Sequence, residues 1–72
     1  MNNKTTKIYS LGRNIFKKRK QMGYSQNQLA ERVNISREHL AKIETAKRTV
    51  SLDLLIDIAN ELKTKVCDLI EF

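Results

Sequence analysis

The 72-residue sequence contains no proline, no tryptophan, two glycines and a single cysteine. One cysteine cannot form an intramolecular disulfide and is typical of a reducing compartment, so we expect a cytoplasmic protein. No apolar run approaches the roughly 20 residues that a membrane-spanning helix needs, and the N-terminal stretch lacks the apolar segment of a secretory signal. These absences favour one small domain that does not enter a membrane.

Residues that serve catalysis or bind metals are also scarce. One His and one Cys do not make a metal site of the usual ligand spacing, and there is no Gly-rich phosphate-binding loop. His39 would need a nucleophile and an orienting group to act as a general base, and the sequence offers neither. We therefore expect no enzyme, no metal and no cofactor, and nothing in the sequence implies a small-molecule effector.

The charged residues, by contrast, are numerous and unevenly placed. The formal net charge is +6, but residues 1–50 carry twelve Lys and Arg against three Glu, which gives +9, whereas residues 51–72 carry two Lys against five Asp and Glu, which gives −3. A basic half attracts polyanions such as DNA, and an acidic half faces away from them. Modest asymmetry is also common in small soluble proteins, so composition alone leaves nucleic-acid binding undecided.

Residues 25–46 (SQNQLAERVNISREHLAKIETA) hold two short amphipathic segments joined by a tight turn. Ser25 and Gln28 have the spacing of a capping box, which predicts a helix start. The apolar residues that follow lie on one helical face: Leu29, Ala30 and Val33. Asn34 readily adopts the left-handed conformation that ends a helix. Because Ala30 has almost no side chain, we expect the next helix to cross close to it.

The second segment begins at Ser36, a good N-cap, and turns Leu40 and Ile43 towards the core. Its opposite face is a polar stripe spaced as one side of a helix: Arg37, Glu38, Ala41, Lys42 and Thr45. This stripe offers donors and an acceptor on a helix, the element that fits the DNA major groove. A solvated face with an i, i+4 pair between Glu38 and Lys42 is the alternative.

These residues resemble the helix-turn-helix of the Cro/C1-type (XRE-like) transcriptional regulators. The resemblance covers residues 11–70 through motifs in the same order and spacing: Leu11-Gly12-x-x-Ile15, Arg19, Gly23, Ser25-Gln26-x-x-Leu29-Ala30, Ile43-Glu44 and Leu52-x-x-Leu55-x-x-Ile58-Ala59-x-x-Leu62. The sequence departs from the family where Asn34 replaces the turn glycine, and where Ala46 and Val50 replace Gly and Pro. Because alanine tolerates positive φ poorly, the path of residues 46–50 is left open.

The resemblance implies an all-α, compact five-helix Cro/C1-type (lambda repressor-like) DNA-binding domain. We expect this single domain at residues 9–72, after a flexible N-terminal arm at residues 1–8, with the motif at residues 25–46. Helices are predicted at residues 9–22 and 52–62, with a short fifth helix at residues 66–70. The core stripe expected for the fourth helix is Leu52, Leu55, Ile58, Ala59 and Leu62.

Arg19 interrupts the apolar face of the predicted first helix. A buried charge needs a partner, because an unpaired one is very costly. In the family, the matching Arg pairs with the Glu that here is Glu44, so the resemblance implies a structural ion pair between the first helix and the recognition helix, the second helix of the motif. The alternative is that Arg19 lies along the phosphate backbone of DNA.

The resemblance also implies DNA contacts. Family side chains matching Arg37, Glu38 and Lys42 read base edges, and the one matching Gln26 holds the backbone at a helix N-terminus. An Arg binds guanine through two hydrogen bonds, and a Glu accepts one from cytosine. We expect base reading by Ser36, Arg37, Glu38 and Lys42. We expect backbone contacts from Ser25, Gln26, His39, Lys47 and Arg48.

The C-terminal residues carry more apolar groups than one thin helix can hide. One recognition helix covers only a few base pairs, whereas a two-fold dimer reads a second half-site with the same residues. We expect a homodimer interface at Leu54, Cys67, Ile70 and Phe72. The predicted function is a sequence-specific double-stranded DNA-binding regulator, a repressor or autoregulator like small phage repressors or restriction-modification controller proteins. An antitoxin or other protein-interaction module that binds its own promoter is the alternative.

Overall fold

The computed structural model describes residues 3–70, with side chains from residue 7 onward, and contains five helices and no strand over that range. The helices are α1 (Asn3–Gln21), α2 (Gln26–Arg32), α3 (Arg37–Glu44), α4 (Leu52–Glu61) and α5 (Val66–Leu69). The predicted all-α, five-helix architecture is therefore confirmed. None of the described helices has both the length and the apolar character required to cross a bilayer.

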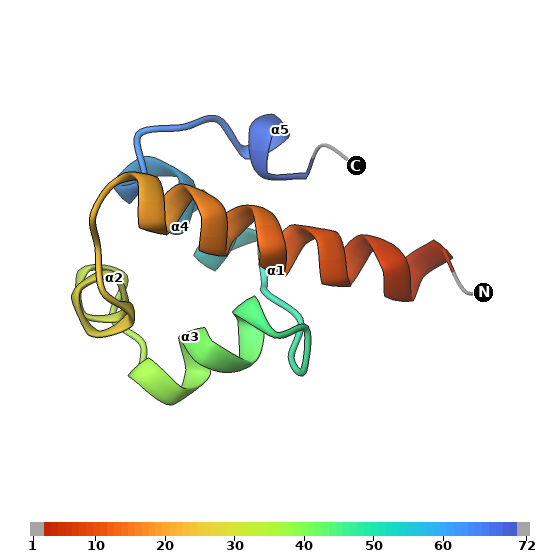
Figure 1. Cartoon of the computed structure of the whole chain (residues 1–72), viewed down its shortest axis with the longest axis horizontal. Coiled ribbons are helices and arrows are strands. Elements are labelled where there is room, and N and C mark those ends of the chain that lie inside the picture. The colour runs from red at the N-terminus through yellow and green to blue at the C-terminus, as the bar shows by residue number, and fades with distance from the viewer. Residues whose placement is uncertain (1–2, 71–72) are drawn as a thin grey trace.

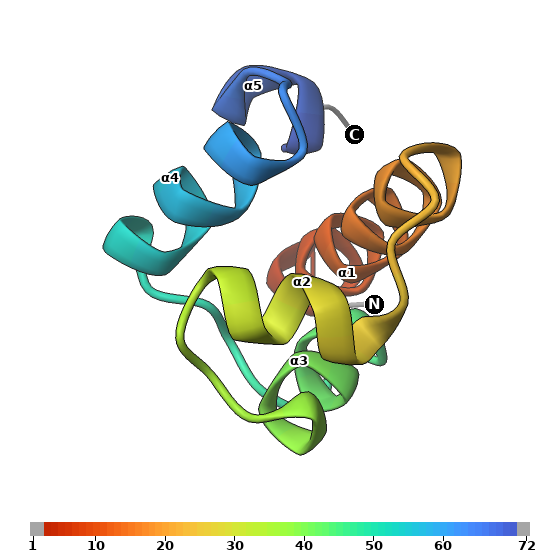
Figure 2. The same cartoon turned by 90° about the vertical axis from the view of Figure 1, so that its left-hand side faces the viewer.

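The longest helix, α1, runs lengthwise between the other elements, with α3 on one side and α5 on the other (Figure 1). The second view, turned by 90°, shows α2 and α3 stacked together, and α4 and α5 stacked together above them (Figure 2). The helix-turn-helix formed by α2 and α3 thus occupies one end of the molecule, and the α4–α5 pair occupies the other.

A single apolar core joins all these layers, with buried side chains from every helix. Its largest fully buried members are Ile15, Leu29, Leu40, Ile58, Leu62 and Leu69. Ala30 of α2 is only 1% exposed, and α2 packs against α3. Leu52 is the exception to the predicted core stripe, because it is 67% exposed at the first turn of α4. A periodic stripe cannot show whether the end of a helix projects beyond the elements that cover the rest of it.

The predicted helix boundaries of the motif rest on observed caps. The Ser25 hydroxyl accepts a hydrogen bond from the Gln28 amide at 3.0 Å, and the Gln28 side chain accepts one from the Ser25 amide at 2.8 Å, which completes the capping box. Ser36 caps α3 with a single bond, in which its hydroxyl oxygen accepts from the His39 amide at 3.0 Å. Asn34 has a φ of 60°, so it ends α2 in the left-handed conformation expected of it.

The start of α1 differs from expectation. The helix begins at Asn3 rather than near residue 9, so residues 3–8 of the predicted arm are helical; residues 1 and 2 lie outside the described range. The stretch contains neither proline nor glycine, and extending an existing helix adds one hydrogen bond per residue without the cost of a new nucleus. Apolar periodicity, which located the helix, only marks the part that packs against the core.

Candidate nucleic-acid interface

One side of α3 presents polar side chains to solvent. Arg37, Glu38 and Lys42 are exposed, whereas Leu40 and Ile43, on the opposite side of the same helix, are buried. Ser36, also exposed, uses its hydroxyl oxygen to accept a hydrogen bond from the His39 amide at 3.0 Å. Of the four residues expected at base edges, Arg37, Glu38 and Lys42 therefore lie on the solvent-facing side of α3, and Ser36 lies directly before its first residue.

The other end of α3 is held by direct contact with the backbone of α1. A methyl group placed on Gly12 would lie 2.5 Å from the carbonyl oxygen of Ile43 and 2.8 Å from that of Glu44. Real side-chain carbons do not approach carbonyl oxygens that closely, so only glycine permits this crossing. Gly12 thus sets the distance between α1 and the C-terminal end of the candidate recognition helix.

A buried ion pair fastens the same two helices. The Arg19 Nε and Glu44 Oε2 atoms are 2.6 Å apart, and Arg19 Nη2 donates to Glu44 Oε1 at 3.1 Å, a bidentate arrangement. Arg19 Nη1 donates to the backbone oxygen of Tyr24 at 2.8 Å, and each charged residue is only 5% exposed. Burial places Arg19 inside the domain rather than along a phosphate backbone, which resolves the alternative in favour of the pair.

Gln26 extends this pair towards the surface, a connection for which the sequence carries no signal. Its amide nitrogen donates to Glu44 Oε1 at 3.0 Å, and its amide oxygen accepts from Arg37 Nη1 at 3.5 Å. The first hydrogen bond is well formed, whereas the second is at the limit of hydrogen bonding and weak. A polar chain therefore runs from Arg19 through Glu44 and Gln26 to Arg37 at the surface.

The loop after α3 resolves the question left open by Ala46. This alanine has a φ of 62°, and the amides of Ala46 and Lys47 bond to the carbonyls of Ile43 and Lys42 at 3.1 and 2.8 Å. This is the Schellman arrangement that usually ends in glycine. Lys47 and Arg48 are exposed directly after it. Of the remaining expected backbone contacts, Ser25 is exposed and His39 is half-buried.

The four residues expected at a dimer interface do not share one environment. Ile70 is 42% exposed and Cys67 is exposed, whereas Leu54 is half-buried and packs against the core. Phe72 lies outside the described residues. Two further apolar side chains of α4 are exposed, Leu52 at 67% and Ile56 at 40%. The sequence analysis did not predict that these two side chains are exposed. For Ile56 a signal was present, because it lies outside the predicted core stripe of α4.

The geometry defines a class: a small helical domain with a helix-turn-helix whose second helix is solvent-facing. Residues 15–69 match the helix-turn-helix family HTH_3, and the chain belongs to this XRE-type family. It is a DNA-binding transcriptional regulator by family and fold. A comparison with curated protein sequences gave no significant match.

Solved structures of regulators superpose closely on the chain. The clp gene regulator ClgR from Corynebacterium glutamicum has a TM-score of 0.85 at 27% sequence identity, covering 88% of this chain and 67% of that one. The restriction-modification controller protein C.AhdI from Aeromonas hydrophila has a TM-score of 0.82 at 26% identity, covering 86% and 94%. The master regulator for biofilm formation SinR, in complex with DNA, has a TM-score of 0.80 at 29% identity, covering 85% and 98%.

Proposed function

We propose that this chain is a sequence-specific repressor or autoregulator that binds a pseudo-palindromic operator as a homodimer. The observation that carries the proposal is the construction of α3: one side presents Arg37, Glu38 and Lys42 to solvent, and the other is fixed by Gly12 and by the buried pair of Arg19 and Glu44. A rigid helix that displays a donor-acceptor pattern is what major-groove reading requires. The proposal includes no catalytic step and no cofactor.

In this proposal α3 lies in the major groove, with its N-terminal residues towards the bases. Arg37 donates two hydrogen bonds to a guanine, Glu38 accepts from a cytosine amino group, and Lys42 reaches a guanine or a phosphate one turn further on. Ser36 lies at the same end and contacts a base edge through its hydroxyl group. The negative charge of Glu38 also disfavours positions where it would face a phosphate, and this sharpens sequence preference.

Backbone contacts surround this reading helix. Ser25 and Gln26 lie at the start of α2, where amide groups and the helix dipole favour a phosphate, and His39, Lys47 and Arg48 add donors around and after α3. Gln26 has a second task in this proposal, because its amide oxygen also contacts Arg37. Phosphate contacts of this kind contribute affinity and fix the position of the protein on any DNA sequence, whereas the base contacts of α3 distinguish one sequence from another.

The homodimer is supported by charge and by exposed apolar surface. Residues 51–72 carry a charge of −3, against +9 for residues 1–50, so the basic half faces DNA and self-association falls to the other half. The exposed apolar residues of that half are Leu52, Ile56, Cys67 and Ile70, and we propose that they form the interface with Leu54 and Phe72. Half-sites about one helical turn apart, ~34 Å, then match two recognition helices.

Selection of bound sequences from random double-stranded DNA tests this proposal. We expect a pseudo-palindromic consensus with two half-sites, and tighter binding of the whole palindrome than of either half. Titrations at several salt concentrations should show steep salt dependence for random DNA, because phosphate contacts release counterions. Recovery of no consensus, or equal affinity for a half-site and a palindrome, would contradict sequence reading or dimeric binding, respectively.

A further inference from the structure

Aromatic and basic side chains alternate along one side of α1. They recur at intervals of four, three and four residues, which places them on a single helical face: Tyr9, Arg13, Phe16 and Lys20. These four residues are called the α1 stripe. Tyr9 is 56% exposed, and among the described residues neither it nor the half-buried Phe16 packs against the apolar core. The two aromatic rings are therefore not explained by the folding of the core.

The ring of Phe16 holds the guanidinium group of Arg13 in place. Arg13 Cζ lies over this ring at 5.2 Å from its centroid, and Arg19 Cζ lies at 5.3 Å, both within the roughly 6 Å of a cation–π contact. A guanidinium group stacked by its face keeps the N–H donors of its edge free to bind an anion. The charge of Arg19 is paired with Glu44, whereas Arg13 forms no ion pair with any residue of the described range. Arg13 is thus an unpaired, exposed cation in a supported position.

A series of side-chain contacts connects Arg13 to the candidate nucleic-acid interface. Phe16, beneath Arg13, contacts Arg19, and Arg19 pairs with Glu44. Glu44 in turn accepts a hydrogen bond from the side chain of Gln26 at 3.0 Å, in the first turn of α2. This turn and α1 lie on the same side of the molecule, with α4 on the other (Figure 2). The α1 stripe therefore continues the surface on which Gln26 is proposed to contact a phosphate.

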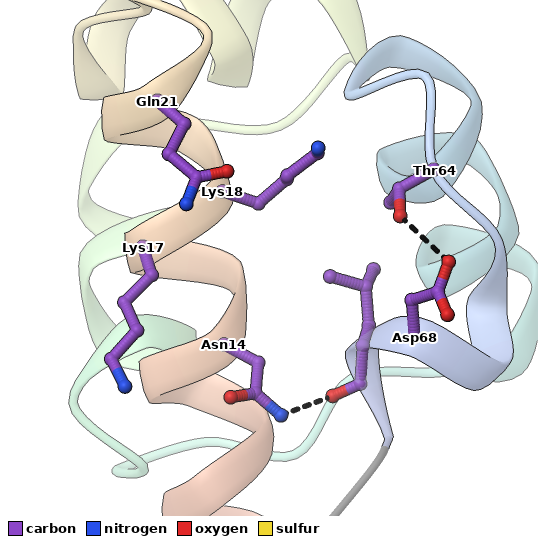
Figure 3. Close-up of a pocket in the computed structure, with 7 residues that line it drawn as sticks. Asn14, Lys17, Lys18, Gln21, Thr64 and Asp68 are labelled. Carbon is purple, nitrogen blue, oxygen red and sulfur yellow. Dashed lines mark hydrogen bonds between the residues drawn. The ribbon is translucent and has the colours of Figure 1, made fainter.

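The opposite edge of α1 is engaged with the C-terminal part of the chain. The side-chain amide of Asn14 donates to the backbone oxygen of Leu69 at 2.8 Å, and the half-buried side chain of Lys18 extends towards Thr64 (Figure 3). The α1 stripe makes no such bond to α5. Its two cations are exposed, so this is the side of α1 that a large anionic partner can reach.

We propose that the α1 stripe binds the phosphate backbone of the same double-stranded DNA, beside the contact of Gln26; this inference rests on the proposed function. Arg13 donates from the free edge of its guanidinium group, Lys20 from its ammonium group and Tyr9 from its hydroxyl group. The helix rises about 16 Å from Tyr9 to Lys20. One DNA strand presents a phosphate roughly every 3.4 Å along the axis, so more than one phosphate lies within this length. Such contacts add affinity for every sequence.

The salt dependence of binding to random duplex DNA tests this inference, because each phosphate contact adds about 0.9 to the slope of log affinity against log salt. Arg13→Gln and Lys20→Gln should each lower the slope by about that amount, and should weaken binding to the selected operator and to random DNA by the same factor. The control is Lys65→Gln, which removes the same charge at an exposed position directly before α5 and should keep the wild-type slope. A wild-type slope in both Arg13→Gln and Lys20→Gln would overturn this inference alone. A wild type that does not bind duplex DNA would overturn the proposed function with it.

Two further variants test the stacked arrangement of Arg13 on Phe16. Arg13→Lys keeps the charge but loses the planar donor group, so affinity should fall while the salt slope stays that of the wild type. Phe16→Leu removes the ring beneath Arg13 and should have the same effect. Circular dichroism shows whether each variant is folded, and Arg13→Lys decides the outcome if Phe16→Leu does not fold. Wild-type affinity in Arg13→Lys would overturn the role of the stack, because a charge at that position would then be sufficient.

Discussion

The two halves of this chain place charged and apolar side chains in opposite ways. Between residues 7 and 50 two charged side chains are buried, and these two, Arg19 and Glu44, pair with each other. Between residues 51 and 70 the acidic groups remain outside the core, and apolar side chains such as Leu52 and Ile70 reach the surface. Directional polar bonds orient a helix more specifically than apolar contact does, so the first half suits precise presentation of α3. Exposed apolar area suits association with a second protein molecule.

Removing one partner of the buried ion pair should reduce the stability of the fold more than any other change considered. Glu44→Ala leaves the Arg19 guanidinium buried without its carboxylate, and we expect a loss of about 3–5 kcal/mol in the free energy of unfolding. A small domain has only about 5–15 kcal/mol in total, so much of the protein would be close to unfolding. Urea denaturation followed by circular dichroism measures the loss.

The matched control for this variant is Glu38→Ala, which removes a carboxylate from the exposed side of the same helix. Its unfolding free energy should change by no more than about 0.5 kcal/mol, as for other surface substitutions. A melting temperature of Glu44→Ala close to that of the wild type would show that the buried pair does not stabilise the first half of the chain.

The second-largest loss of stability is expected when α1 and α3 are forced apart at Gly12. Alanine is favoured over glycine in a helix by about 1 kcal/mol, so an unconstrained Gly12→Ala substitution would stabilise α1. Here the new methyl group meets two backbone carbonyl oxygens, and we expect a net loss of about 1–3 kcal/mol, as for other overpacked sites. Chemical denaturation of Gly12→Ala beside Lys17→Ala, an exposed position of α1, measures it. A gain in stability would mean that α1 and α3 separate easily.

Removing the proposed guanine contact should change DNA binding without changing folding. Arg37→Ala is expected to cost about 1–3 kcal/mol of binding free energy at the specific site and to relax the preference at one base position. Fluorescence anisotropy with the selected operator and with random DNA measures both effects. Because Arg37 is exposed and its contact with Gln26 is long, the unfolding free energy should be nearly unchanged.

Gln26→Ala is the companion of that variant and should weaken specific and random DNA alike, since its proposed main partner is a phosphate. Equal losses on specific and random DNA for Arg37→Ala would show that this arginine also contacts only the backbone. A loss confined to specific DNA for Gln26→Ala would instead show that Gln26 acts mainly by orienting Arg37.

The smallest effect on folding is expected from the acidic half. Ile70 is exposed in the monomer, so Ile70→Glu should change the unfolding free energy by about 0.5 kcal/mol or less. A charge inside the proposed interface should nevertheless prevent dimerisation and most specific binding. Sedimentation at a protein concentration of about 100 µM, far above a micromolar dissociation constant, measures the state of association.

Asn60→Glu is the control, because it adds the same charge at an exposed polar position of α4. We expect it to remain dimeric and to bind the operator as the wild type does. If the wild type is monomeric at that concentration and remains monomeric when the operator is added, the acidic half does not mediate self-association, and the proposed homodimer is wrong.

Much of the fold could be predicted from local patterns in the sequence. The capping serines, Asn34 and the apolar spacing located the motif, since a cap depends on residues within one turn of it. The left-handed conformation of Lys63 after α4 had no such signal, because that position is neither glycine nor asparagine. The start of α1 was missed for a related reason: the helix continues where apolar periodicity stops.

The candidate site was predicted in part. Three of the residues expected to read bases, Arg37, Glu38 and Lys42, lie on the exposed side of α3, because helical periodicity alone decides which side chains share a face. The fourth, Ser36, is the N-cap that precedes the helix. The contact from Gln26 to Glu44 could not be predicted, since it joins residues 18 positions apart on different helices.

The sequence by itself determined that there are five helices, the serine caps of α2, α3 and α4, the face that each of these helices buries and the family, because these depend on periodicity and on neighbours along the chain. Only the tertiary structure decided which charges meet, how closely α1 approaches α3 and which apolar side chains of α4 and α5 remain outside. Those features depend on crossing distances of a few ångströms between helices. Such distances result from the packing of all the core side chains together, and no single segment of the sequence specifies them.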